Sequence, residues 1–146
     1  MKIKLDINPK YKELEVHICN ESDSKQVREV LRTIKDTFDT SVMGYSDGEV
    51  IPVGSSDIIR IFAQNQRVYV TTEEGTFRLH ERLYELEEKL DNSRFLRISN
   101  SEIVNLKKIQ RLDTNLTGTV KMFLDGSQET YVSRRYVSKI KKALGI

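Results

Sequence analysis

Side chains that could act in catalysis or hold a metal are few and scattered in this sequence. The two histidines, His17 and His80, each lack a second ligand at metal-binding spacing, so we expect structural or surface residues. Neighbouring carboxylates at 73–74 and 87–88 fall in a turn and on a polar helix face, where ordinary solvation accounts for them. The chain has no phosphate-binding loop of the form G-x-x-x-x-G-K-S/T and no G-x-G-x-x-G segment. The sequence therefore predicts no enzyme, no catalytic residue, no metal site and no cofactor.

Size and composition are typical of one soluble globular domain with a short extension. The chain has 146 residues, of which 38% are hydrophobic and 32% charged. No apolar run approaches the ~20 residues of a transmembrane helix, and the N-terminus lacks the apolar core of a secretion signal. We therefore expect a cytoplasmic protein. The single cysteine, Cys19, cannot form an intrachain disulfide and is expected to be a buried structural thiol.

Charge is unevenly distributed along the chain. From Arg94 onward there are 11 Lys or Arg against 4 Asp or Glu, whereas the preceding residues hold 13 basic and 18 acidic side chains. The net charge of the C-terminal part is thus +7, and that of the rest is −5. A polyanion would bind the basic part, although many globular surfaces carry a basic side that binds nothing.

The first 45 residues predict a small β-β-α segment. Apolar and polar residues alternate at 3–7 and again at 14–19, with Asn8-Pro9-Lys10 as the turn between two half-buried strands. Ser22-Asp23-Ser24 can cap a helix, and apolar residues then recur at helical spacing as far as Phe38. Such a segment is too small to be expected as an independent domain.

Residues 50–146 predict a second, β-rich domain. Thr72-Glu73-Glu74-Gly75 and Asp125-Gly126 are turn sequences between β-prone runs and predict two hairpins. Two short helices are expected, a leucine-rich one at 80–90 and a basic one at 133–144 that Ser133 can cap. The fold class is mainly β with short helices (α+β). The predicted strands are 50–53, 58–62, 68–71, 76–79, 95–98, 103–104, 109–112, 119–124 and 129–132.

Several short segments occur in an order that resembles the LytTR DNA-binding domain. A hairpin at 68–79 precedes the leucine helix, and Arg94-Phe95-Leu96-Arg97-Ile98-Ser99-Asn100-Ser101 leads into Ile103-Val104-Asn105. Val132-Ser133-Arg134-Arg135-Tyr136 then matches the family's terminal "S-R-R" turn. Each segment alone is common, but their conjunction in this order is specific. One residue departs from the pattern, since Glu102 stands where the family often has an aromatic or apolar residue.

The resemblance implies a fold of packed antiparallel β-sheets in which loops enter successive major grooves of DNA and contact the minor groove between them. Three loops of this sequence match the family's base-contacting loops, and all carry hydrogen-bonding side chains. Gln66 or Arg67 would read purine edges, Asn100 suits the minor groove, and the third loop offers Arg134 together with Arg135, which can grip guanine bidentately. The expected phosphate contacts are Arg97, Ser101, Lys107, Lys108, Ser133 and Lys139.

The family resemblance also implies partners and leaves two alternatives open. The chain resembles a stand-alone subgroup without a receiver domain, whose members are commonly paired with a small membrane protein that restrains them. We therefore expect a bacterial regulator that binds double-stranded DNA at repeated promoter sites, self-associates there, and takes no small-molecule substrate. The alternative is a protein-interaction module that keeps the LytTR fold without DNA binding and uses residues 1–45 as its contact surface. RNA binding is a weaker third reading, because no aromatic stacking platform is evident.

Overall fold

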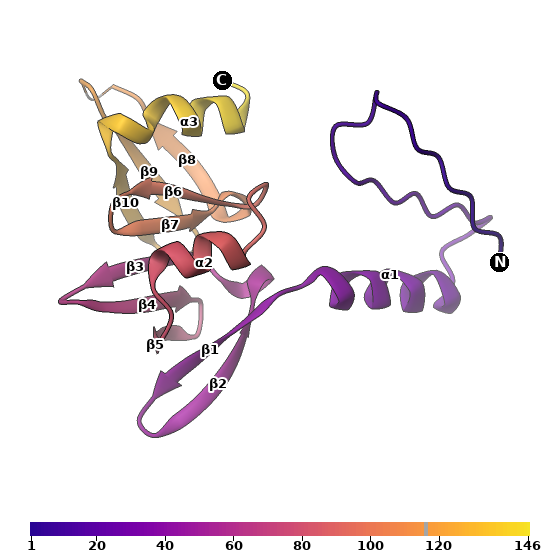
Figure 1. The fold of residues 1–146 in the computed structure, drawn as a ribbon, viewed down its shortest axis with the longest axis horizontal. Coiled ribbons are helices and arrows are strands. Elements are labelled where there is room, and N and C mark those ends of the chain that lie inside the picture. The colour runs from indigo at the N-terminus through magenta and orange to yellow at the C-terminus, as the bar shows by residue number, and fades with distance from the viewer. Residues whose placement is uncertain (116) are drawn as a thin grey trace. The chain divides into compact units, whose positions relative to one another are not determined.

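The computed structural model describes residues 1–115 and 117–146, and it divides into two compact units. Unit 1 is Met1–Phe38 and unit 2 is Asp39–Ile146 (Figure 1). The boundary expected from the sequence, between residues 45 and 50, falls inside the first hairpin of unit 2. The units are described separately.

Unit 1 consists of an extended segment and one helix, α1 (Lys25–Phe38). The helix begins as predicted, because Ser24 Oγ accepts a hydrogen bond from the Val27 amide at 3.3 Å. The two strands predicted at 3–7 and 14–19 are wrong, since residues 1–24, all of them described, form no strand. An isolated two-stranded hairpin is marginal in water, and α1 does not cover this one. Cys19 is accordingly exposed, which corrects the expectation of a buried thiol.

Unit 2 is built on a seven-stranded antiparallel sheet with the order β2-β1-β5-β4-β3-β7-β6. Both turn sequences form the predicted hairpins: β4 pairs with β5, and β9 pairs with β10. The sequence did not predict β1, whose Gly44 has low strand propensity but lets the backbone pass Phe77 closely. A Cβ at Gly44 would lie 2.8 Å from Phe77 Cβ. The strands are β1 (Ser41–Ser46), β2 (Glu49–Gly54), β3 (Arg60–Gln64), β4 (Arg67–Thr72), β5 (Gly75–Leu79), β6 (Phe95–Ser99) and β7 (Glu102–Asn105).

A smaller three-stranded sheet follows, with the order β10-β9-β8. Its strands are β8 (Ile109–Asp113), β9 (Val120–Leu124) and β10 (Gln128–Val132). Two short 3-10 helices, Ser55–Asp57 and Leu106–Lys108, precede β3 and β8. In β9 the buried and half-buried residues alternate, as the sequence predicted, so that one face lies on the core.

Two helices complete unit 2, α2 (Leu83–Lys89) and α3 (Arg134–Leu144). The first is shorter than the predicted 80–90, and His80 lies outside it, with its ring stacked on Tyr45 at 3.7 Å between centroids. The turn after α2 is held by Asp91, and hydrogen bonds from the Ser93 amide and hydroxyl lower the pKa of this carboxyl. That turn directs the chain into β6.

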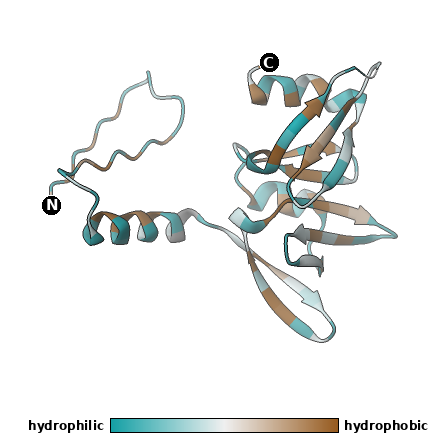
Figure 2. Ribbon diagram, turned by 180° about the vertical axis from the view of Figure 1, so that it is seen from behind, coloured by the Kyte–Doolittle hydropathy of each residue, from teal (hydrophilic) through white to brown (hydrophobic). Residues whose placement is uncertain are grey.

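The interior of unit 2 contains two apolar clusters. One lies between the large sheet and α2 and includes Ile61, Val70 and Leu86, all fully buried. The other joins α3 to β6 and the small sheet through Ile98, Met122 and Ile140. Figure 2 shows the hydrophobic segments of this interior in brown, alternating with hydrophilic ones along the strands. Because both clusters are closely packed, the turns at the ends of the strands are carried on a rigid scaffold.

Candidate nucleic-acid interface

Backbone pairing brings the three sequence-predicted loops to one end of unit 2. Because β3 pairs antiparallel with β7, the end of β3 lies beside the β6–β7 turn, and Ala63 N donates to Ser101 O at 2.8 Å. The end of β10 meets β6, where Ser133 N donates to Ile98 O at 2.9 Å. The loops at residues 65–67, 99–101 and 133–135 are therefore neighbours in space although they are distant in sequence.

Two of the predicted base contacts touch each other at this end. Arg135 Nη2 donates to Asn100 Oδ1 at 3.0 Å, and both side chains are exposed. Arg135 Nη2 also lies 2.9 Å from the Tyr136 hydroxyl, which fixes the direction of the guanidinium. Asn100 Oδ1 thus accepts from Arg135, while Nδ2 of the same amide is a donor.

Arg97 is the residue that holds the second loop in shape. Its Nη2 donates to the Asn100 carbonyl at 2.6 Å and its Nε to the Ser99 carbonyl at 3.0 Å, while Nη1 pairs with Glu87. The side chain is 17% exposed. The sequence analysis predicted Arg97 as a phosphate contact, but in this structure its donors are directed at its own loop and α2.

The first loop is a two-residue turn, Asn65 and Gln66, between β3 and β4. Both residues have positive φ, 51° and 63°, as a hairpin turn of type I′ requires. Asparagine tolerates this conformation, whereas glutamine adopts it at a cost that glycine would avoid. The turn places the Gln66 side chain at the tip, and Arg67 follows as the exposed first residue of β4.

A cationic hollow beside this turn was missed by the sequence analysis. Arg67, Arg78 and Arg82 line it together with His80 and Glu81. One carboxylate oxygen of Glu81 is buried without a hydrogen-bond partner among the described residues, and the three arginines outnumber it in charge. The sequence signal was weak, because these arginines come from a strand start, the middle of β5 and the residue before α2.

The third loop leads into α3. Ser133 occupies the predicted N-cap position, but its hydroxyl makes no capping hydrogen bond, because its carbonyl instead accepts from Tyr136 N at 2.8 Å. Arg134 turns toward Gly118, where an added Cβ would lie 2.7 Å from Arg134 Nε. Lys139 is exposed on α3, one turn beyond Arg135 on the same helix face.

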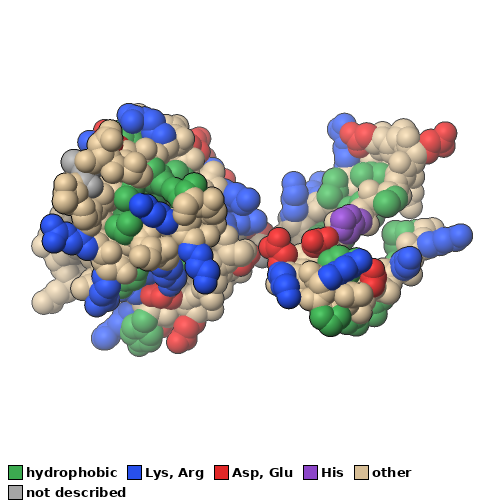
Figure 3. Space-filling view, turned by 90° about the horizontal axis from the view of Figure 1, so that it is seen from above, with side chains coloured by type: hydrophobic (Ala, Val, Ile, Leu, Met, Phe, Trp, Pro, Cys, Tyr) green, Lys and Arg blue, Asp and Glu red, His purple; other side chains and the backbone are tan. Residues whose placement is uncertain are grey.

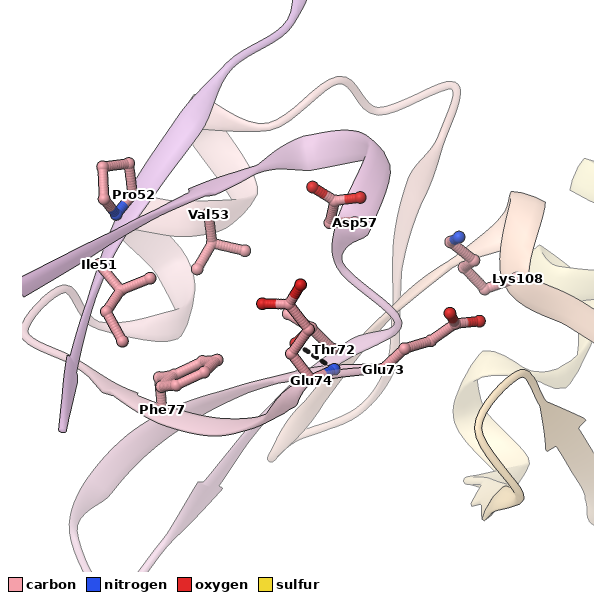
Figure 4. A pocket seen from close by; sticks show the side chains of 9 residues that line it. All are labelled: Ile51, Pro52, Val53, Asp57, Thr72, Glu73, Glu74, Phe77 and Lys108. Atoms are coloured by element: carbon pink, nitrogen blue, oxygen red, sulfur yellow. Dashed lines mark hydrogen bonds between the residues drawn. The ribbon is translucent and has the colours of Figure 1, made fainter.

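Lys107 and Lys108 do not join the three loops. They follow β7 at the end of that strand opposite to the Ser99–Ser101 turn. Figure 4 shows Lys108 at the rim of a pocket with Asp57, Glu73 and Glu74, an acidic surrounding. Lys108 Nζ also lies 4.0 Å from the Asp125 carboxylate. The neighbours of Lys108 are thus acidic, unlike those of Arg135 in the third loop.

Glu102, the departure from the family pattern, is a buried structural residue. Its carboxylate accepts from Arg60 Nη1 at 2.9 Å and from Thr130 Oγ1 at 2.7 Å, and the residue is only 8% exposed. The ion pair joins β3 to β7 within the large sheet, and the Thr130 hydrogen bond ties β7 to β10 of the small sheet, next to the second loop. Asn105 is likewise buried and donates to the Ile58 carbonyl at 2.8 Å.

The chemistry available at this end is hydrogen bonding and ion pairing. Figure 3 shows Lys and Arg side chains distributed over the side of unit 2 that is in view. Within residues 1–115 and 117–146, no group of three His, Cys, Asp or Glu could hold a metal ion. Over the same residues, none of the helices is long and apolar enough to cross a membrane. Amide and guanidinium groups on a rigid edge can recognise an anionic polymer that presents hydrogen-bonding groups in grooves.

Comparisons with known proteins point to the same class. The family model described as the LytTr DNA-binding domain matches residues 48–145. Two uncharacterized HTH-type transcriptional regulators of Staphylococcus aureus, from strains MSSA476 and MW2, are each 36% identical over 147 residues, covering 100% of this chain and 99% of the relative. A LytTr DNA-binding domain from Bacillus cereus is structurally similar, with a TM-score of 0.71 and 29% identity over 73% of this chain and 98% of that one. The relatives are named for a helix-turn-helix motif, which consists of two consecutive helices. In the described part of this chain, strands separate α1, α2 and α3 from one another along the sequence.

Proposed function

Because the chain belongs to the LytTr DNA-binding domain family, we propose that it is a transcriptional regulator that binds double-stranded DNA through the three turns at one end of unit 2. The observation that carries this proposal is the convergence of the turns, with Asn100 and Arg135 in direct contact. Polar side chains carried on strand ends can be inserted into DNA grooves without deforming the scaffold that holds them. Family membership and geometry together favour this function over a protein-interaction module.

Each turn is assigned to a groove by its donors and acceptors. Asn100 enters the minor groove, where A·T pairs present only acceptors, because its amide Nδ2 is a donor. Arg135, which contacts Asn100, reads guanine in the adjoining major groove, and Arg134 precedes it in the same loop. Gln66 or Arg67 reads purine edges in the other major groove. A minor-groove contact flanked by two major-groove contacts follows one face of the duplex.

Phosphate contacts are assigned to residues around these turns. The hydroxyls of Ser101 and Ser133 and the ammonium of Lys139 are exposed at this end. Arg78 and Arg82 in the cationic hollow extend the same surface next to the first turn. We do not assign phosphate to Arg97, whose guanidinium is engaged within its loop, or to Lys107 and Lys108 at the opposite end.

Two finer features of the proposal concern partners. Two chains would bind side by side at repeated promoter sites, and DNA as ligand implies a cytoplasmic location. The small membrane protein is a partner that only the family resemblance suggests. No contact of the described residues bears on it, so we leave it as a prediction from the sequence.

Selection of bound sequences from random DNA, followed by a salt titration on the selected site, tests the function. Three cationic phosphate contacts, Arg78, Arg82 and Lys139, should give a slope of log affinity against log salt of about −3. Arg82→Ala should make the slope shallower by about one. Arg111→Ala is the matched control, because Arg111 lies on β8, two strands away from β10, with its guanidinium over Phe123 at 3.6 Å. Absence of any salt-dependent DNA binding would favour the protein-interaction module instead.

Replacing Gln66 by glycine should separate stability from recognition. The positive φ at Gln66 suits glycine, so Gln66→Gly should raise the free energy of unfolding by roughly 1 kcal/mol while discrimination between DNA sequences falls. Thermal unfolding and competition binding against random DNA measure the two effects. Asp47→Gly is the control, because Asp47 has the same conformation (φ 48°) in the β1–β2 turn and should change stability only. Unchanged discrimination in Gln66→Gly would assign the base contact to Arg67.

A further inference from the structure

Several large apolar side chains of unit 1 are exposed. Ile3, Leu5 and Ile7 are 88, 80 and 84% exposed, and Leu14 is 77% exposed. Large exposed apolar patches mark interaction sites in soluble proteins. Apolar side chains are visible on the surface of unit 1 in Figure 3.

The exposed residues belong to a hairpin whose turn is present and whose strands are not. Tyr11 N donates to Asn8 O at 3.1 Å, and Lys10 N donates to Asn8 Oδ1 at 3.0 Å, so the turn is closed. The Tyr11 hydroxyl reaches back to Asp6 at 2.9 Å. Both limbs alternate apolar and polar residues with a period of two, which is the pattern of strands that cover something. What they lack is the covering layer, because two strands alone are marginal in water.

Helix α1 carries a matching apolar stripe. Val27, Val30 and Ile34 are half-buried, and Leu31 on the same side is 41% exposed. Most helices of this length owe their stability to packing of one face. Within unit 1 the apolar stripe of α1 is only partly buried. The helix and the hairpin therefore both have exposed apolar side chains.

We propose that unit 1 is a dimerisation module, in which the hairpin and helix of one copy cover those of a second copy and the strands form on association. Area supports a second copy: seven exposed Ile, Leu and Val side chains, at on the order of 100 Å² each, give roughly 700 Å² per copy, close to the ~800 Å² per partner of standard interfaces. Charge supports it too, because unit 1 has eight Lys or Arg against seven Asp or Glu, so two copies do not repel each other strongly.

The Staphylococcus aureus relatives match unit 1 as well as unit 2. The family model begins at residue 48, but the Staphylococcus aureus relatives match over the whole of this chain, residues 1–38 included. A dimer joined through unit 1 would carry two copies of unit 2. Binding of the first to DNA would then raise the effective concentration of the second at a neighbouring site. This consequence rests on the proposed function, whereas the dimer itself does not.

The mass of the full chain in solution without DNA, measured by light scattering and sedimentation over a concentration series, tests the proposal. We expect a dimer in the wild type and a dissociation constant raised about a hundredfold or more in the double variant L5Q/V16Q, which makes both apolar faces polar. The matched control, K4Q/E15Q, changes the adjacent polar positions on the same two limbs and should dimerise like the wild type. Amide hydrogen exchange at 3–7 and 14–18 should be slow in the wild-type dimer and fast in L5Q/V16Q.

Two results would overturn the inference: a chain that stays monomeric at every concentration, or a dimer that L5Q/V16Q leaves as tight as the control does. Thermal unfolding of both variants verifies that unit 2 remains folded. DNA binding by a monomeric chain would leave the proposed function intact, and a dimer without DNA binding would leave this inference intact, so the two can fail separately.

Discussion

Alanine at Asn100 or Arg135 is expected to weaken preference for the operator sharply while the protein stays folded. Each side chain is exposed and contributes donors rather than core packing, so its removal should scarcely change the free energy of unfolding. Loss of one good base contact is worth about 1 to 3 kcal/mol of discrimination, which reduces the ratio of specific to non-specific affinity roughly 5- to 150-fold. Non-specific binding should persist, because it depends on the phosphate contacts.

Competition of the selected site against random duplex, at one fixed salt concentration, measures this ratio. Arg111→Ala serves as the control for the loss of one exposed arginine outside the turns. Full-strength specific binding by both Asn100→Ala and Arg135→Ala would refute the proposed readout and leave only the fold-level assignment.

The contact between Asn100 and Arg135 also predicts how the double alanine variant should behave. Because Arg135 Nη2 holds Asn100 Oδ1, either single substitution releases the other side chain. The two effects should therefore combine to less than their sum, with a coupling energy of about 0.5 kcal/mol or more. Strict additivity would mean that the contact seen between them does not orient Asn100.

Glu102→Ala is expected to produce the largest loss of stability. It leaves the Arg60 guanidinium, whose side chain is 20% exposed and whose Nε already lacks a partner within the described residues, without its counter-charge. Removing one partner of a buried ion pair costs about 3 kcal/mol, taking the low end of the range because Arg60 keeps some solvent. The melting temperature should fall by on the order of 10 °C.

Urea and thermal unfolding measure this loss, and Arg60 provides the internal control. In Arg60→Leu combined with Glu102→Leu no charge is left buried, so much of the lost stability should return. If Glu102→Ala costs under about 1 kcal/mol, the ion pair is solvated and the tie between β3, β7 and β10 is weak. Because β7 starts at the second turn, Glu102→Ala should also weaken specific DNA binding.

Predictions that depend on neighbouring residues were confirmed. Thr72 to Gly75 and Asp125-Gly126 form hairpins, because a turn requires only its own few residues to adopt suitable dihedral angles. Strand β1 was missed for a non-local reason, since the contact that favours Gly44 is with Phe77, 33 positions along the chain. The predicted hairpin brings Arg78 close to Arg67, but only the start of α2 decides that Arg82 shares their hollow.

In unit 1 the predicted strands are absent from the structure. The alternation at 3–7 and 14–18 is genuine, and the turn at Asn8 forms, yet the strands do not. Periodicity indicates which side chains need to be buried, but not whether the same chain supplies the residues that bury them. The half-exposed stripe of α1 has the same explanation.

Sequence by itself determined the family, the β-rich class of unit 2 and the polar character of the three turns, because motif order and turn chemistry are local properties. Only the tertiary structure decided that these turns meet at one end, that Asn100 and Arg135 touch, and that Arg97 and Glu102 support them. It also separated Lys107 and Lys108 from that surface, although they lie close to Asn100 along the chain. The physical reason is strand pairing: it brings together residues far apart in sequence and sends the two ends of one short strand to opposite ends of the sheet.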